Sequence, residues 1–222
     1  MVKYYTSEEI LKKKDEITAA LARENCIRGK FFEMIQARIS ELPKTASILE
    51  LGPGAGYALD ALNQAGFSNL HNVDIDDYLQ FKEFKKRFKK CDLNTQKLPY
   101  KDNTFDCVLA LEVFEHLENF PFALRECARV LKKGGLLVFS RPNGWSIYNR
   151  IRYLKGANTT VVTPGNNHIN DMSRNLLMKL TEKYFKFERI IAEPAVVPLI
   201  HIPIKGRVLF SDHLCFVFKK AF

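Results

Sequence analysis

The apolar positions of the chain switch repeatedly between the spacing of a helix and that of a strand. Between residues 44 and 143, short apolar runs alternate with stretches in which apolar side chains recur every three or four positions. The pattern predicts strands at 47–51, 70–75, 105–113 and 135–140, and helices at 57–65, 77–89 and 120–132. Strands joined by helical stretches of this length predict right-handed crossovers and a parallel sheet with helices on both faces.

The flanking regions are less regular, and they suggest the organisation of a single domain. We expect a helical N-terminal extension at 1–43, a core at 44–143, and a lid or substrate insertion at 144–172. A C-terminal helix and strands follow at 173–222, with Ser173 as the helix-capping residue. The expected class is α/β, with a Rossmann-like, doubly wound sheet.

Composition narrows the class of protein without naming a function. The 222 residues are 46% hydrophobic and 27% charged, as in ordinary globular proteins. The five cysteines form no C-x-x-C pair, which favours reduced thiols over disulfides or structural zinc. No apolar run approaches the roughly 20 residues of a membrane span, and the first residues lack a signal-peptide core. We therefore expect a cytoplasmic protein.

Charge is concentrated in the last third of the chain. Residues 141–222 carry 13 basic and 5 acidic side chains, a difference of +8 out of the total of +9. This excess favours an anionic substrate, a membrane surface or a nucleic acid near that part, although a solvated lysine-rich surface would also explain it.

A glycine-rich turn follows the first predicted strand. Gly52, Gly54 and Gly56 come directly after the strand that contains Glu50, and glycine allows the backbone to approach a ligand closely. Tyr57 stands where the dinucleotide fingerprint needs its third glycine, and no P-loop lysine follows. What remains is a G-x-G-x-G turn preceded by an acid, Glu50.

Acidic residues also end the next two strands. Asp74 lies about 20 residues beyond the glycine turn, where a carboxylate can accept both hydroxyls of a ribose. Asp92 ends a short third strand, where it can receive the amine of adenine. Three acids at neighbouring strand ends suit a nucleoside with a cationic amino-acid tail better than a pyrophosphate. This is the charge pattern of S-adenosylmethionine.

Three further motifs complete a family resemblance over residues 48–143. The run from Leu93 to Asp106, the segment Glu112-Val-Phe-Glu-His116 and the run from Arg129 to Gly135 resemble the class I S-adenosylmethionine-dependent methyltransferases. They are similar in particular to the small-molecule branch that includes the ubiquinone-biosynthesis O-methyltransferases. The resemblance implies a seven-stranded, mostly parallel sheet with an antiparallel last strand.

The resemblance also implies the cofactor and its contacts. The cofactor would be S-adenosyl-L-methionine, leaving S-adenosyl-L-homocysteine as product. The methionine tail would contact Glu50, Gly52, Gly54 and Gly56. The ribose would contact Asp74 and Ile75, and the adenine would contact Asp92 and Leu93.

The residues after the fourth strand are candidates for the chemistry. A sulfonium methyl needs a nucleophile in line behind it, and it needs a base only if that nucleophile carries a proton of high pKa. His116 is the candidate base, because a reference pKa near 6.5 suits proton removal at neutral pH. His116 could instead only hold the following loop. As a third alternative, Glu112, Glu115 and His116 could bind magnesium, as the ubiquinone O-methyltransferases suggest, although magnesium prefers oxygen ligands.

We expect the basic last third of the chain to bind the molecule that receives the methyl group. The candidate substrate contacts there are Arg141, Asn143, Arg150 and His168. A helix at 145–155 places Ile147, Ile151 and Leu154 on one face, as in a helix that caps the core or lies at an interface.

Three readings of function follow, and the first is favoured. It is O- or N-methylation of a small molecule, and an anionic or lipid-like acceptor and peripheral membrane contact are alternatives considered within it. The second is methylation of RNA or protein, and the third is a non-catalytic cofactor-binding subunit. Nucleic acid is disfavoured, because the aromatics at 81–88 have helical spacing toward the core and the Asn-Pro-Pro-aromatic turn of base-modifying enzymes is missing.

Overall fold

The computed structural model describes residues 35–36, 38–156, 168–192, 195–196, 203–204 and 208–221. Most of the expected N-terminal extension and residues 157–167 of the expected lid lie outside the described residues. Within them, no helix is both long and apolar enough to cross a bilayer.

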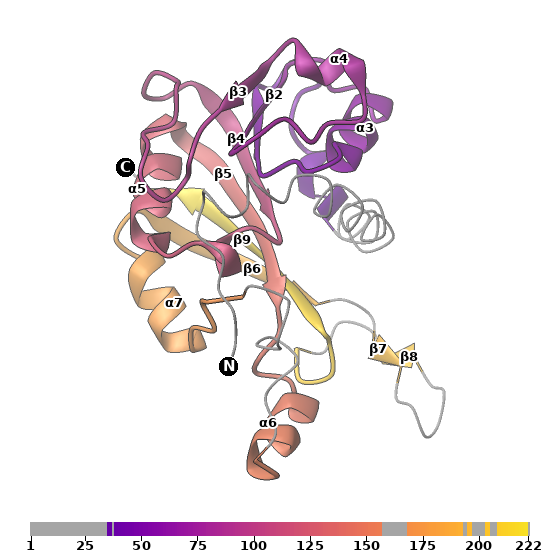
Figure 1. Ribbon diagram of the computed structural model, residues 1–222, viewed down its shortest axis with the longest axis vertical. Helices are drawn as coiled ribbons and strands as arrows, with labels where there is room; N and C mark the ends of the chain where they lie inside the picture. The colour runs from indigo at the N-terminus through magenta and orange to yellow at the C-terminus, as the bar shows by residue number, and fades with distance from the viewer. Residues whose placement is uncertain are drawn as a thin grey trace.

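A seven-stranded sheet forms the centre of the molecule, in the order β3-β2-β1-β4-β5-β9-β6 (Figure 1). Its strands are β1 (Ile48–Leu51), β2 (Leu70–Asp74), β3 (Phe88–Lys90), β4 (Phe105–Leu111), β5 (Leu131–Pro142), β6 (Phe185–Ala192) and β9 (His213–Lys220). The first five pair in parallel, and β9 runs antiparallel to both of its neighbours, β5 and β6. The expected mostly parallel sheet with an antiparallel last strand is confirmed.

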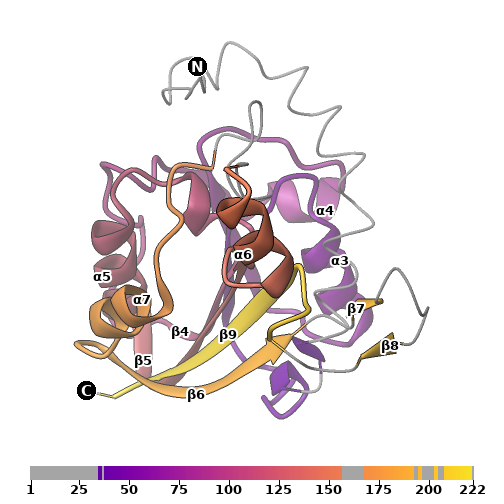
Figure 2. The same cartoon turned by 90° about the horizontal axis from the view of Figure 1, so that it is seen from below.

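Helices cover both faces of this sheet. The helices of the described residues are α3 (Tyr57–Gln64), α4 (Lys82–Lys85), the 3-10 turn η1 (Phe114–His116), α5 (Phe120–Val130), α6 (Ile147–Leu154) and α7 (Arg174–Thr181). The helices α5 and α7 lie on one side of the sheet and α3 on the other (Figure 2). A small hairpin of β7 (Ala195–Val196) and β8 (Pro203–Ile204) stands apart.

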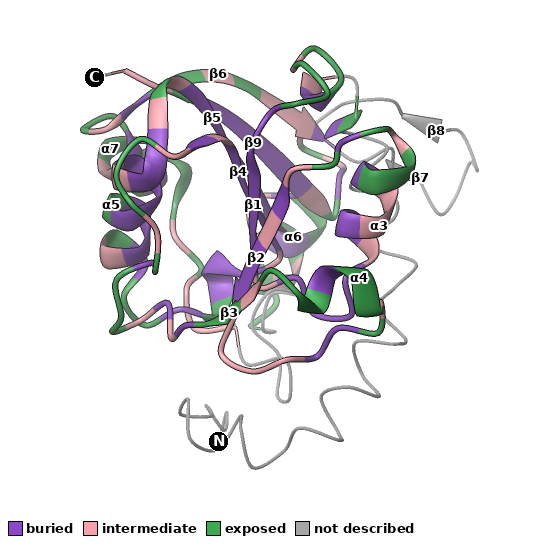
Figure 3. Ribbon diagram, turned by 90° about the horizontal axis from the view of Figure 1, so that it is seen from above, coloured by how far each residue is buried: buried purple, intermediate pink, exposed green. Residues whose placement is uncertain are grey.

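The core consists of two apolar layers separated by the sheet. Along β4, Val108 and Ala110 pack in the layer that contains Leu124 of α5, whereas Leu109 packs in the layer that contains Leu59 of α3. Both faces of the central strands are therefore buried, as Figure 3 shows, and this explains their nearly continuous apolar sequences.

The helix expected at 77–89 is wrong in extent. Only one turn forms, α4, and the chain then enters the edge strand β3. The Phe84 carbonyl oxygen accepts a hydrogen bond from Asn72 Nδ2 on β2 (3.1 Å), an oxygen that a longer helix would use for its own backbone. Phe84 is buried and Phe81 and Phe88 pack beside it, so the aromatics face the core as expected.

Candidate active site

The glycine turn makes a tight bend at the carboxyl end of β1. Gly52, Gly54 and Gly56 all have positive φ (59°, 53° and 93°). A Cβ added to Gly52 would lie 2.8 Å from Val113 Cγ2, and one added to Gly56 would lie 2.9 Å from Leu79 Cδ2. Glycine is therefore needed both for the backbone angles and for the close approach of the neighbouring loops.

The three expected acids lie at the ends of adjacent strands. Glu50 is fully buried in β1. Asp74 ends β2, and its Oδ1 accepts a hydrogen bond from the Ile75 backbone N–H (2.7 Å). Because β1, β2 and β3 are parallel neighbours, these acids share one edge of the sheet with the glycine turn. A buried carboxylate beside a positive-φ glycine turn fits the ammonium and backbone-like tail of S-adenosylmethionine.

Asp92 has a structural role in the described fold. Its Oδ1 accepts from the Asn94 backbone N–H (2.9 Å) and its Oδ2 from Thr95 Oγ1 (3.0 Å). The carboxylate thus stabilises the turn after β3. A carboxylate has about four acceptor positions, so this turn leaves room for a contact with adenine.

Glu112 is held in place by its neighbours in the sheet. Its backbone is left-handed, with φ of 54°, which is costly for a residue other than glycine. Ser140 Oγ donates to Glu112 Oε1 (2.7 Å) and accepts from the Glu112 backbone N–H (3.0 Å). His213 Nε2 lies 3.8 Å from the other carboxylate oxygen. These contacts fix the sharp bend at the end of β4.

Glu115 is buried beneath this bend. Burial, and then the nearby Glu112 carboxylate, raise the pKa of Glu115 well above its ordinary value, and Arg141 opposes the shift only in part. A protonated Glu115 can share its proton with Glu112, so the pair carries one negative charge rather than two.

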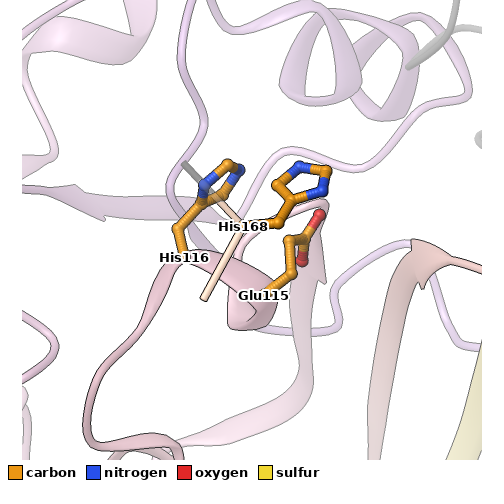
Figure 4. Close-up of side chains that lie close together, drawn as sticks. All are labelled: Glu115, His116 and His168. Carbon is orange, nitrogen blue, oxygen red and sulfur yellow. The ribbon is translucent and has the colours of Figure 1, made fainter. Parts of the chain in front are cut away.

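His116 and His168 meet at the surface above Glu115. Their rings are 4.7 Å apart and inclined by 67°. One ligand atom from each of Glu115, His116 and His168 lies within 4.8 Å of the others (Figure 4). The backbone N–H groups of Ile169 and Asn170 donate to the Glu115 carbonyl oxygen (2.8 and 3.1 Å), which ties this end of the expected lid to η1. The expectation that His168 reaches the site from the lid agrees with this geometry.

The residues considered as an alternative magnesium site, Glu112, Glu115 and His116, are not the set that the fold brings together. Glu112 turns toward Ser140, and His168 joins Glu115 and His116 in its place. Two imidazoles and a carboxyl with a raised pKa are unlike the oxygen-rich shell that magnesium prefers. The donor set therefore does not fit magnesium, and no step proposed below uses a metal.

Two of the expected substrate contacts are buried and have hydrogen-bond partners within the protein. Arg141 is only 3% exposed, and its Nη2 donates to the Asn170 carbonyl oxygen (2.7 Å) and lies 3.6 Å from Asp171 Oδ1. Asn143 is also buried, and its Nδ2 donates to the carbonyl oxygens of Val208 (2.6 Å) and Ser211 (2.7 Å). Both residues position the segments around the site. Their place at the end of a strand was predictable, but their hydrogen-bond partners, 29 to 68 residues away, were not.

Ser140 and Asn170 shape the site although the sequence pattern did not single them out. Ser140 is the first polar residue after the apolar run of β5, a position that could have suggested a strand-end contact. Asn170 has no such signal. Its side chain donates to the Leu117 carbonyl oxygen and secures the lid segment a second time.

Known proteins are similar to this chain over its core. Residues 49–139 match the family model described as a methyltransferase domain. An uncharacterized protein of Methanocaldococcus jannaschii is 36% identical over 107 residues, which is 48% of this chain and 46% of that protein. A protein of Mycobacterium tuberculosis named a probable S-adenosylmethionine-dependent methyltransferase is 30% identical over 132 residues, or 58% of this chain and 45% of its own length. The chain thus matches less than half the length of each of these relatives.

Solved structures extend the likeness to the whole fold. The crystal structure of an S-adenosylmethionine-dependent methyltransferase of Thermotoga maritima has a TM-score of 0.61 and 21% identity, and the match covers 89% of this chain and 97% of that one. The matched domain, the relatives and the order of the strands lead to one conclusion: residues 49–139 are a methyltransferase domain, in a chain that has the fold of the class I S-adenosylmethionine-dependent methyltransferases.

Proposed function

We propose that this chain is an active enzyme that transfers the methyl group of S-adenosylmethionine to an oxygen or nitrogen of a small molecule, with hydroxylated acceptors favoured. The observation that carries the proposal is an exposed imidazole, His116, beside the glycine turn. In the β1–β4 pairing Leu51 lies opposite Ala110, so the turn after β1 and the loop after β4 start side by side. The cofactor turn and the candidate base therefore lie at the same edge of the sheet.

The chemistry needs few groups. The acceptor oxygen attacks the methyl carbon in line with the sulfur, and the carbon–sulfur bond breaks with its electron pair left on sulfur. The hydroxyl proton passes to a ring nitrogen of His116, so S-adenosylhomocysteine and the methyl ether leave. His168, in contact with His116, narrows the range of positions that the imidazole can adopt. Proximity supplies most of the acceleration, because the sulfonium is already reactive.

Incubation with tritium-labelled S-adenosylmethionine and a metabolite extract tests this proposal directly. We expect label in a low-molecular-weight product, and identification of that product would name the acceptor. Label in protein or RNA alone would contradict the small-molecule assignment, and no transfer at all with intact cofactor binding would favour a non-catalytic subunit.

The rival assignment to RNA rests on the basic last third of the chain. A gel-mobility experiment with bulk RNA separates the two, since RNA binding through these charges would weaken steeply with salt. We expect no RNA complex at physiological ionic strength.

A further inference from the structure

Exposed apolar side chains are concentrated on helix α6. Five of the eight large apolar side chains that are exposed in the described part of the chain lie on this one helix: Ile147, Tyr148, Ile151, Tyr153 and Leu154. Leu154 is 84% exposed and Tyr153 is 74% exposed. In a soluble protein, an apolar patch of this kind marks a contact surface.

The helix is amphipathic in the opposite sense to an ordinary surface helix. Its buried residue is polar: Asn149 is 1% exposed, and its Nδ2 donates to the Asn143 carbonyl oxygen (2.9 Å). With about 100° of rotation per residue, Ile147, Ile151 and Leu154 fall within roughly 60° of one another on the opposite side. The apolar stripe therefore faces away from the protein, whereas a helix that caps the core would turn it inward.

Arg150 and Lys155 border this stripe on its two sides, and Arg152 lies farther round the helix. Arg150, Arg152 and Lys155 lie on or next to α6, and the sequence from Arg141 to Gly156 holds no acidic residue. The Arg152 guanidinium lies 5.7 Å from the centre of the Tyr148 ring. Figure 1 shows α6 beyond the ends of β5 and β9, where it projects from the body of the molecule.

We propose that α6 docks on the surface of an anionic lipid bilayer. The apolar stripe would enter the boundary between headgroups and acyl chains, the tyrosines would lie at the headgroup level, and the cations would face the lipid phosphates. A second copy of the chain fits less well, because two such helices would bring six cations together without an acid. With only two turns of helix, the attachment is weak and reversible, and it depends on anionic lipid.

Docking would also orient the candidate active site. The indole Nε1 of Trp145, at the start of α6, donates to the Met172 carbonyl oxygen (3.1 Å). Arg141 binds the same segment at Asn170, close to His168. The helix and the acceptor side are therefore linked, and if the proposed function holds, the acceptor is an amphiphile taken from the bilayer surface.

Trp145 is the only tryptophan of the chain, so it provides a built-in reporter next to α6. The experiment mixes the full chain with vesicles of phosphatidylcholine alone or with phosphatidylglycerol added, and measures co-sedimentation and quenching of Trp145 by brominated lipid. We expect binding to the anionic vesicles only, with affinity that falls as salt rises, because exposed charges are screened over about 8 Å at physiological ionic strength.

Two double variants test the apolar stripe and the basic side chains of α6 separately. Ile151→Ser with Leu154→Ser should weaken vesicle binding at least roughly 10-fold through lost apolar burial. Arg150→Gln with Arg152→Gln should weaken it by at least roughly 10-fold through lost attraction to the anionic surface. The matched controls are Leu176→Ser, an exposed leucine on α7, and Lys86→Gln with Lys90→Gln, two exposed lysines near β3. We expect both controls to bind as the wild type does.

Three vesicle results would overturn the proposal: no binding by the wild type, equal binding to neutral vesicles, or α6 variants that bind as well as their controls do. A fourth would be a wild-type dimer in light scattering that the α6 variants dissociate. Binding of S-adenosylhomocysteine, measured separately, distinguishes the two proposals. Vesicle binding without cofactor binding would remove only the proposed function, and cofactor binding without vesicle binding would remove only the docking.

Discussion

At the scale of single residues, the bend after β4 decides which side chain can do chemistry. Glu112, Glu115 and His116 are close in sequence but point to different surroundings: Glu112 to Ser140, Glu115 into the core, and His116 to the surface. Only His116 is both exposed and at the cofactor edge. The bend thus separates the structural acids from the candidate base.

Replacement of His116 by alanine should cut turnover by roughly 10²–10⁴-fold, because no imidazole is then left to take the proton from the hydroxyl group that is methylated. Affinity for S-adenosylhomocysteine should stay unchanged. Single-turnover methyl transfer and calorimetric binding check both expectations, with His71→Ala on β2 as a histidine control away from the site. Full activity in His116→Ala would mean that the imidazole only holds its loop.

Asp74→Ala should weaken S-adenosylhomocysteine binding by about 1.5–3 kcal/mol, the cost of losing hydrogen bonds to a charged group. Asp74→Asn should lose less, because it keeps one oxygen that can accept from the Ile75 N–H. Titration calorimetry on the two variants gives the comparison. Equal, unchanged affinities would assign the ribose to another residue.

The raised pKa of Glu115 makes a prediction about pH and stability. The folded state holds this proton at pH values where the unfolded chain, with the ordinary value of 4.5, has released it. The folded state therefore binds more protons, and the free energy of unfolding falls as pH rises above about 4.5 toward the raised pKa.

Glu115→Gln removes this titration but keeps a donor for Glu112. We expect its free energy of unfolding to depend less on pH than that of the wild type over the same range. Urea unfolding at a series of pH values measures the two slopes. Identical slopes would show that Glu115 ionises normally.

At the scale of elements, the glycine turn between β1 and α3 combines backbone strain with close contact. Gly56 and Gly66 offer a matched pair, since their φ angles are 93° and 92°. A Cβ on Gly56 would lie 2.9 Å from Leu79 Cδ2, whereas one on Gly66 would have only an ordinary contact of 3.7 Å with Lys44 Cδ. An alanine substitution at Gly66 therefore tests the energetic cost of the backbone angle, and one at Gly56 tests that cost together with crowding in the glycine turn.

Alanine at either glycine should lower the free energy of unfolding by about 1–2 kcal/mol through the left-handed backbone alone. Only Gly56→Ala should also weaken S-adenosylhomocysteine binding, because only Gly56 lies in the cofactor turn. Thermal unfolding and calorimetry of both variants provide the test. Loss of binding in Gly66→Ala as well would point to a general loosening of the fold.

At the scale of the whole molecule, cofactor binding should stabilise the fold by mass action. S-adenosylhomocysteine at about 100 times its Kd should add about 2.7 kcal/mol and raise Tm by roughly 5–10 °C. NAD should produce no shift, because the turn lacks the dinucleotide spacing. Differential scanning fluorimetry with both ligands checks this, and equal shifts would contradict the cofactor assignment.

The sheet and the cofactor edge could be predicted from sequence because local patterns determine them. A few consecutive residues are enough to recognise the apolar run at 48–51, the three glycines and the acid at 74. The acceptor side could not be predicted in the same way, because it depends on contacts between distant segments. Arg141 lies at a strand end like a ligand contact, and only the fold shows that Asn170 is its partner.

The extent of one helix could not be predicted either. The spacing of Phe81, Phe84 and Phe88 suits a helix, yet the last part of this segment pairs with β2 as a strand.

The place of β9 has a consequence for the newly made chain. This strand is the last of the seven to be synthesised, yet it lies between β5 and β6 and pairs with both. Until His213–Lys220 has left the ribosome, β6 has no strand to join and β5 presents one open edge. Nascent chains halted before this point would therefore expose apolar strand edges of the kind that invite aggregation and chaperone binding.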